Sequence, residues 1–307
     1  MNLSADRRTY LKLAAVTMIW GGTFVAGRYL AASVDPLLAA SLRFVLASLA
    51  LLLFMTFARI PLARPNPAQL AQLVALGACG IYAYNLCFFY GLQYINASRA
   101  SLIVALNPAV IGLASWLLFR ERLGGYKLLG IALCLGGATT VIVSRNPQLL
   151  EGTANAWRGD LLIVGCVVGW SVYSLFSRGL NQSLGPLQTV TWSILLGTLM
   201  LVVTTLATGR LTLEGLGAIH MPQLLSLLYL GVLGSALAYI GYYDGLRRIG
   251  ATRAGVFIAL NPLTAVVCGA LLLDEPLTWP MLCGGGVILL GIYLCNKPLA
   301  PAKALGI

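Results

Sequence analysis

Two stretches of the chain carry residues that could bend a helix and bind a solute. The sequence RASLIVALNP, which ends at Pro108, recurs as RAGVFIALNP, which ends at Pro262. A proline inside a helix removes a backbone donor and frees a carbonyl group one turn earlier, so the helix kinks. The preceding Asn107 and Asn261 can satisfy that local deficit or hydrogen-bond a substrate, and the two roles are compatible. We therefore expect both prolines to act as hinges and both asparagines to face a binding site.

Two tryptophans mark a second candidate feature. Trp20 is followed one turn later by Thr23, and Trp170 is followed in the same way by Tyr173. Tryptophans in membrane segments often form an interfacial belt. Both of these lie about ten residues into an apolar segment, which is near mid-depth at about 1.5 Å per residue. This depth favours a cavity over a belt, with ordinary packing as the alternative.

A third group lies on one face of a predicted helix. Tyr82, Asn85 and Phe89 have the spacing i, i+3, i+7, and a shift of 154 positions maps Asn85 onto Tyr239 and Phe89 onto Tyr243. Such a face could be packed through interhelical hydrogen bonds. Buried aromatic rings with polar tips need partners, however. We therefore expect these five residues to line the cavity.

Ionisable groups are scarce inside the apolar segments. Arg43 is the basic residue that lies well inside one, and it could bond backbone carbonyls or a substrate carboxylate. The acidic residues fall in or near connections, and Asp244 is the deepest. Proton- and sodium-coupled carriers usually bury a carboxylate, so we expect facilitated efflux, with proton coupling as the alternative. The single His220 and the scattered cysteines have no ligand spacing, so we expect neither a metal site nor a cofactor.

The composition tells which elements must hold these residues. Of 307 residues, 59% are apolar and 9% are charged, whereas soluble domains carry about 25% charged residues. A bilayer-spanning helix needs about 20 mainly apolar residues, and backbone groups in lipid must pair internally. The sequence therefore predicts an all-α integral membrane protein. The net charge of +11 is spread singly or in pairs, which excludes a nucleic-acid partner. Ten segments qualify as spans: 11–31, 37–57, 69–92, 97–119, 126–144, 160–180, 187–208, 223–246, 251–273 and 279–296.

The spans form two related halves. Aligning residues 91–108 with 245–262 gives ten identities in eighteen positions, and Trp20, Arg28 and Pro36 recur 150 positions later. Each half holds five spans, residues 1–147 and 158–307, and because five is odd the second half must be inverted. With cytoplasmic termini, fourteen Lys and Arg lie inside and five outside, which fits the positive-inside rule. Inverted repeats around a midplane site are typical of secondary transporters.

This pattern resembles the EamA-type members of the drug/metabolite transporter superfamily over essentially the whole chain. Each half carries a G-L-x-x-I-x-A-[ST]-R-A stretch, an L-N-P and a Glu at the end of its fourth span. The resemblance implies ten helices and export of small metabolites, with amino-acid exporters of the YddG type as the nearest likeness. Triose-phosphate and nucleotide-sugar carriers share the superfamily fold, but they would be expected to place basic residues in the cavity.

We therefore expect an exporter of small neutral or zwitterionic metabolites, including aromatic amino acids, that works by alternating access and is not an enzyme. Its partners would be the solute and the lipid of the cell inner membrane. The alternatives are export of other small metabolites or drugs and a channel-like pore. The stretches GIALCLGG and CGGGVILLG suit close helix contact, including a homodimer.

Overall fold

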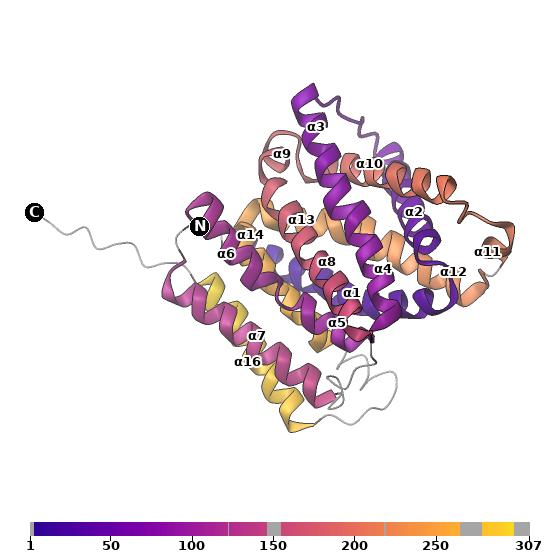
Figure 1. Ribbon diagram of the computed structural model, residues 1–307. Helices are drawn as coiled ribbons and strands as arrows, with labels where there is room; N and C mark the ends of the chain where they lie inside the picture. Colours follow the sequence, from indigo (N-terminus) through magenta and orange to yellow (C-terminus); the bar gives the residue numbers. More distant parts are fainter. Residues whose placement is uncertain (1–2, 122, 146–154, 218, 265–277, 298–307) are drawn as a thin grey trace, which may run out of the picture.

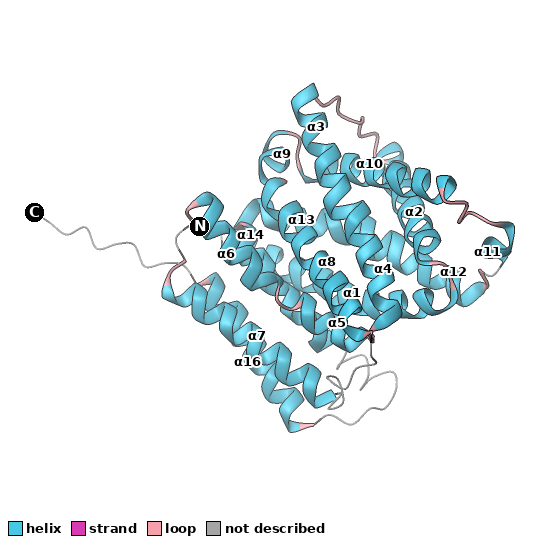
Figure 2. Ribbon diagram, viewed as in Figure 1, coloured by secondary structure: helices cyan, strands magenta, loops and turns pink. Residues whose placement is uncertain are grey.

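The computed structural model describes residues 3–121, 123–145, 155–217, 219–264 and 278–297. Within these ranges the chain is helical apart from short connections, and no strand occurs there (Figure 2). Nine of the helical segments in the described ranges are long and apolar enough to cross a membrane. The all-α membrane class expected from the sequence is confirmed.

The first half contains five predicted spans, some of them built from several helical pieces (Figure 1). Its elements are α1 (Leu3–Ser33), α2 (Pro36–Phe57), α3 (Pro67–Leu76), η1 (Gly77–Ala83), α4 (Tyr84–Tyr94), α5 (Ala97–Val104), α6 (Asn107–Phe119) and α7 (Gly125–Arg145). The third span consists of α3, η1 and α4 in one continuous run, and the fourth consists of α5 and α6.

The second half repeats this order. Its elements are α8 (Ala156–Phe176), α9 (Arg178–Ser183), α10 (Pro186–Ala207), α11 (Leu213–Gly217), α12 (Met221–Leu228), η3 (Tyr229–Leu237), α13 (Ala238–Ile249), α14 (Ala251–Gly255), η4 (Val256–Ala259) and α16 (Trp279–Asn296). The predicted span 251–273 is described as far as residue 264, and its remainder lies outside the described residues.

Short polar side chains start several of these helices. Asp35 accepts hydrogen bonds from the backbone N–H groups of Leu37 and Leu38, and Pro36 takes the first helical position of α2. Asn66 and Gln69 form a reciprocal capping box at the start of α3. These residues satisfy N–H groups that lack an intrahelical partner, so the connections between spans can be short.

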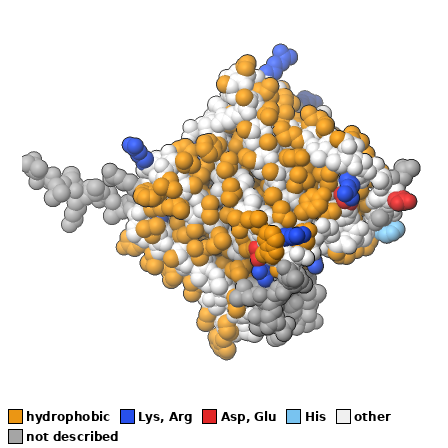
Figure 3. All heavy atoms as spheres, in the orientation of Figure 1, with side chains coloured by type: hydrophobic (Ala, Val, Ile, Leu, Met, Phe, Trp, Pro, Cys, Tyr) orange, Lys and Arg blue, Asp and Glu red, His pale blue; other side chains and the backbone are white. Residues whose placement is uncertain are grey.

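The outer surface is apolar. Figure 3 shows hydrophobic side chains over most of the visible face, with few charged groups among them. Large side chains such as Phe54, Trp116, Leu117, Leu161 and Leu199 are each more than half exposed. A continuous apolar surface of this kind suits contact with lipid tails rather than water.

Sequence-equivalent residues from the two halves meet each other. Residues related by a two-fold axis can touch their own equivalents only where the axis passes between them, so such contacts trace the axis. The pairs are Trp20 with Trp170, whose ring centroids are 5.0 Å apart, Ser48 Oγ with Thr198 Oγ1 at 2.9 Å, and Cys134 Sγ with the Ile288 carbonyl at 3.7 Å. These contacts are compatible with a two-fold relation between the halves.

Helices α7 and α16 pair along one edge of the bundle (Figure 1). A Cβ atom at Gly130 would lie 2.6 Å from the carbonyl oxygen of Gly291, and one at Gly137 would lie 2.6 Å from that of Gly284. The two backbones are therefore in direct contact, and these glycines are used within the chain. A homodimer that uses the same glycines would have to displace this pairing.

Both halves contain a π-helix at the same place. Elements η1 and η3 interrupt equivalent spans, and the sequence analysis predicted neither of them. A Cβ at Gly77 of η1 would lie 2.9 Å from the Ser193 carbonyl oxygen, and one at Gly231 of η3 would lie 2.7 Å from that of Arg43. Gly77 and Gly231 are equivalent, as are Arg43 and Ser193. The π-helices thus cross α10 and α2 at close range, and π-helical turns are frequent at functional sites.

Candidate functional site

A cavity lies between the two halves. Its volume is about 30 Å³, enough for roughly one or two water molecules. The side chains around it come from both repeats and are mostly aromatic, and a bound solute would require some of these rings to move apart. The lining residues are Trp20, Thr23, Phe24, Arg43, Tyr84, Phe88, Val104, Asn107, Trp170, Tyr239, Ile258 and Asn261.

The tryptophans sit at the centre of an aromatic cluster. Trp20 and Trp170 meet edge to face, and Tyr239 packs edge to face against Trp170 with centroids 5.3 Å apart. Tyr242 packs against both tryptophans, at 5.0 and 5.3 Å. The indole N–H of Trp20 donates to the Gly234 carbonyl at 2.9 Å, which ties α1 to η3. Aromatic pairs of this geometry stabilise a core beyond the area they bury, so the cluster holds the cavity in a defined shape.

Arg43 is the charged group in the cavity lining. Its side chain on α2 is 3% exposed. Its Nε donates to Ser235 Oγ at 3.0 Å, and its Nη1 donates to Asn85 Oδ1 at 3.1 Å. The guanidinium carbon also lies 5.2 Å from the ring centroid of Phe44 and 5.7 Å from that of Phe88. The sequence left open whether Arg43 bonds backbone carbonyls or a ligand. In the structure its Nε and Nη1 donate to neutral side chains and not to backbone carbonyls.

The two asparagines of the Asn-Pro pairs also line the cavity. Asn107 donates from Nδ2 to the Val104 carbonyl at 3.0 Å, so its Oδ1 is the free end of the amide. The Oδ1 atoms of Asn107 and Asn261 are both buried and accept no hydrogen bond. A buried acceptor without a donor is unfavourable, and here two of them border the same small space.

The helix breaks near each Asn-Pro pair. Helix α5 ends at Val104 and α6 begins at Asn107, with Pro108 in its first turn. In the second half the 3-10 segment η4 precedes Asn261 and Pro262. Departures from regular α-helix therefore occur at matched places in the two halves, and the kinks and the hinge role of the prolines stay predictions.

The remaining predicted residues do not line the cavity: four lie behind the lining residues, and Tyr82 lies elsewhere. Asn85 bonds Arg43, Phe89 packs against Phe88 at 5.4 Å, and Tyr173 and Tyr243 pack behind Trp170 at 6.2 and 5.8 Å. Tyr82 lies away from the cavity, where its half-buried hydroxyl accepts a hydrogen bond from Thr204 on α10 at 3.1 Å. Of the predicted residues, Trp20, Thr23, Asn107, Trp170, Tyr239 and Asn261 line the cavity itself.

Sequence reasoning missed several lining residues, among them Tyr84, Phe88 and Phe24. The repeat could have pointed to Phe24, which lies one turn after Trp20 as Ser174 lies after Trp170. It gave no signal for Tyr84 and Phe88, which are equivalent to Ala238 and Tyr242. One side of the cavity is therefore closed by phenylalanines that pack on each other, Phe24 with Phe88 at 5.7 Å. The equivalent positions in the other half carry hydroxyl groups.

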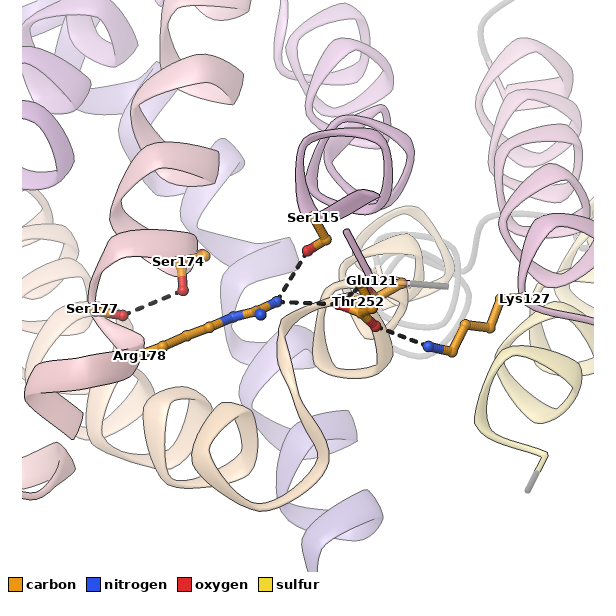
Figure 4. A network of polar contacts seen from close by, with 7 residues as sticks. All are labelled: Ser115, Glu121, Lys127, Ser174, Ser177, Arg178 and Thr252. Atoms are coloured by element: carbon orange, nitrogen blue, oxygen red, sulfur yellow. Dashed lines mark hydrogen bonds and ion pairs between the residues drawn. The ribbon is translucent and has the colours of Figure 1, made fainter. Parts of the chain in front are cut away.

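A polar network ties the two halves together at the end that carries the connection between α6 and α7 (Figure 4). Glu121 accepts hydrogen bonds from Lys127 at 2.8 Å and Thr252 at 3.3 Å, and its Oε2 lies 3.4 Å from Nη2 of Arg178. Arg178 also donates to Ser115 Oγ at 3.0 Å. Burial alone would raise the pKa of Glu121, but Lys127 and Arg178 outweigh it and hold the pKa below its usual value.

An ion pair joins the halves at the other end as well. Arg99 on α5 donates from Nε to Asp160 Oδ1 at 2.7 Å and from Nη2 to Asp160 Oδ2 at 2.6 Å. This bidentate geometry is the strong form of an Arg–carboxylate pair. The first repeat is thus linked to the second at both ends, with the small cavity between.

Comparison with known proteins identifies the family. The model of the EamA-like transporter family matches the chain twice, over residues 7–143 and 157–297. The chain belongs to this family. It is a multi-pass membrane protein of a transporter family, and the two matches correspond closely to the two halves described above.

Similar proteins match more than nine-tenths of this EamA-family chain. A protein from Escherichia coli (strain K12), described as a probable amino-acid metabolite efflux pump, is 29% identical, and the match covers 91% of each chain. An uncharacterized transporter from Archaeoglobus fulgidus is 28% identical over 94% of this chain and 98% of its own. One known crystal structure matches with a TM-score of 0.75 at 19% identity, covering 94% of this chain and 97% of that one, which supports the fold alone.

Proposed function

We propose that this protein is a secondary transporter that exports small neutral or zwitterionic metabolites, amino acids including aromatic ones among them. The observation that carries the proposal is the cavity between the repeats, which combines aromatic rings with Arg43 and two unbonded asparagine oxygens. Solute sites in transporters of this build lie near the midplane at the repeat interface. The name of the Escherichia coli relative supports amino-acid metabolites as the substrate class.

Transport would proceed by alternating access between two inverted five-helix repeats, residues 1–147 and 158–307. The contacts between equivalent residues support this arrangement, because a two-fold axis that passes between Trp20 and Trp170 places the cavity at the symmetric centre. The ion pairs Glu121–Arg178 and Arg99–Asp160 would open alternately, while Pro108 and Pro262 absorb the bending. The two states would then have similar energies, as a reversible carrier requires.

The orientation and energy source belong to the same proposal. The excess of Lys and Arg on one side favours cytoplasmic termini in the inner membrane, which places Glu121 at the cytoplasmic end. No Asp or Glu is among the residues that border the cavity in the described part of the chain. Because coupled carriers usually bury a carboxylate, this lining favours facilitated efflux down the substrate gradient.

Purified protein in liposomes tests the function. We expect saturable uptake of a labelled aromatic amino acid, and Trp170→Ala should strongly reduce it, since Trp170 contacts six other rings of the cluster, namely Trp20, Tyr84, Tyr173, Tyr239, Tyr242 and Tyr243. The matched control is Trp279→Ala, because Trp279 on α16 is 79% exposed and is not among the residues that line the cavity. Equal loss in both variants would contradict the site, and flux that never saturates would favour a pore.

A further inference from the structure

Among the described residues, Arg43 has no counter-charge. Its two side-chain partners, Ser235 and Asn85, are neutral, and no carboxylate of the described residues forms an ion pair with it. Holding an unpaired charge away from water is costly. The equivalent residue in the second repeat is Ser193, which bonds the Tyr173 hydroxyl, so the fold of a repeat does not need an arginine at this place.

The remaining nitrogen of the Arg43 guanidinium, Nη2, is available to bind an anion. Nη2 makes no hydrogen bond to the described residues, while Nε and Nη1 are held by Ser235 and Asn85. The rings of Phe44 and Phe88 further fix the position of the group. The free Nη2 of a guanidinium whose orientation is fixed can donate charge-assisted hydrogen bonds to a carboxylate.

The same cavity offers acceptors for a cation. Asn107 and Asn261 are 2% and 4% exposed, and each has an Oδ1 that accepts no hydrogen bond. Because Asn107 donates its amide N–H to Val104, the oxygen rather than the nitrogen is left over. Carbonyl oxygens can accept from an ammonium group, and the faces of Trp20 and Trp170 can attract it as well.

We propose that the cavity recognises its substrate as a zwitterion, with the carboxylate on Arg43 and the ammonium group on the Oδ1 atoms of Asn107 and Asn261. The side chain of the substrate then lies among the aromatic rings. This assignment rests on the proposed function, and it narrows the substrates to free α-amino acids. Amines that lack a carboxylate and acids that lack an amino group leave one of the two ends of the site unmatched.

A ligand series on the unmodified protein gives the first test. Competition against labelled phenylalanine uptake in liposomes is measured with phenylalanine, 2-phenylethylamine and 3-phenylpropionate. We expect each of the last two to compete at least roughly 30-fold more weakly than phenylalanine, because truncating one partner of a buried charge pair has an effect of this size. Equal competition by all three would overturn the inference while leaving export of aromatic solutes intact. If no amino acid is taken up, the proposed function fails as well.

Variants of the protein show which residue binds the carboxylate of the substrate and which binds its ammonium group. Arg43→Gln should weaken phenylalanine competition by roughly 30-fold and leave 2-phenylethylamine unchanged. Asn261→Ala should weaken phenylalanine and leave 3-phenylpropionate unchanged. The control Arg64→Gln alters an exposed arginine outside the spans and should change none of the three. A merely structural role for Arg43 would weaken the amine and the amino acid alike, and that result would overturn the inference.

The test does not depend on Arg43→Gln being folded. If that variant gives no monodisperse peak on size-exclusion chromatography, Ser235→Ala replaces it, because it removes the bond that orients Nε. We expect a smaller loss in Ser235→Ala that is again confined to ligands with a carboxylate. A loss that extends equally to 2-phenylethylamine would contradict the assignment.

Discussion

Two adjacent glycines in α7 should respond in opposite ways to the same substitution. A Cβ at Gly137 would lie 2.6 Å from the carbonyl oxygen of Gly284 and 2.9 Å from the backbone nitrogen of Ile288, and neither backbone atom can move without shifting α16. Overpacking of this kind costs about 1–3 kcal/mol. At Gly136 nothing lies within 4 Å, so Gly136→Ala should stabilise the helix by about 0.5–1 kcal/mol.

The assay is the midpoint of thermal unfolding in detergent, read from the fraction of protein that stays monodisperse after heating. A chain of 307 residues shifts by about 1.5 °C per kcal/mol at an unfolding entropy of about 2.1 cal/mol/K per residue, so Gly137→Ala should lower the midpoint by roughly 2–5 °C and Gly136→Ala should leave it unchanged or slightly higher. The equivalent contact in the other repeat gives a second pair, Gly291→Ala against Gly286→Ala, with the same expected signs. Equal shifts within each pair would refute the close α7–α16 contact.

Two further predictions concern the motions between states. Glu121→Gln should weaken the link to Arg178 and Lys127 and change the transport rate by the same factor at about pH 5.5 and about pH 7.5. The depressed pKa of Glu121 means that its ion pairs exist above its usual pKa and are lost only as the pH falls through the lower folded-state value; a strong difference between the two pH values would contradict this. Pro108→Ala, which permits a continuous helix, should slow transport while leaving equilibrium binding of the solute within about twofold, and a variant with normal flux would remove the hinge from the mechanism.

Hydrophobicity was sufficient to find nine of the ten predicted spans, and the span 251–273 lies partly outside the described residues. Predicted segments such as 37–57, 187–208 and 279–296 lie within about a residue of helices α2, α10 and α16. The length of the lipid core sets the length of each apolar run, and Pro and Asn at the boundaries mark where it ends. The internal repeat also pointed to Trp20, Trp170, Asn107 and Asn261, which line the cavity.

The π-helix η1 explains why Tyr82 does not share a face with Asn85 and Phe89. Tyr82, Asn85 and Phe89 share a face only if the helix is α-helical throughout, but η1 ends at Ala83 and its wider turns change the direction of the residues inside it. Tyr82 therefore contacts α10, whereas Tyr84 and Phe88 reach the cavity. In the sequence, Gly77 and Gly231 are the residues that could have indicated the π-helices. A glycine in a membrane helix more often marks close helix packing, however.

The ion pairs between the halves could not be predicted from spacing. Glu121 and Arg178 are 57 positions apart, and in the sequence they counted only as charges at span ends. Their contact depends on how the second repeat folds back against the first. A similar limit applied to Arg43, whose partner Ser235 lies in the π-helix of the other half.

The most direct test of the account asks on which side of the membrane two equivalent connections lie. Gly124 follows the fourth span of the first repeat, and Thr278 holds the same place in the second. Gly124→Cys and Thr278→Cys, each in a variant without the native cysteines, are treated in intact cells with a thiol reagent that cannot cross the membrane. We expect labelling at position 278 in intact cells and at position 124 only after the membrane is opened. Labelling of both positions from the same side would contradict the inverted arrangement and the alternating access built on it.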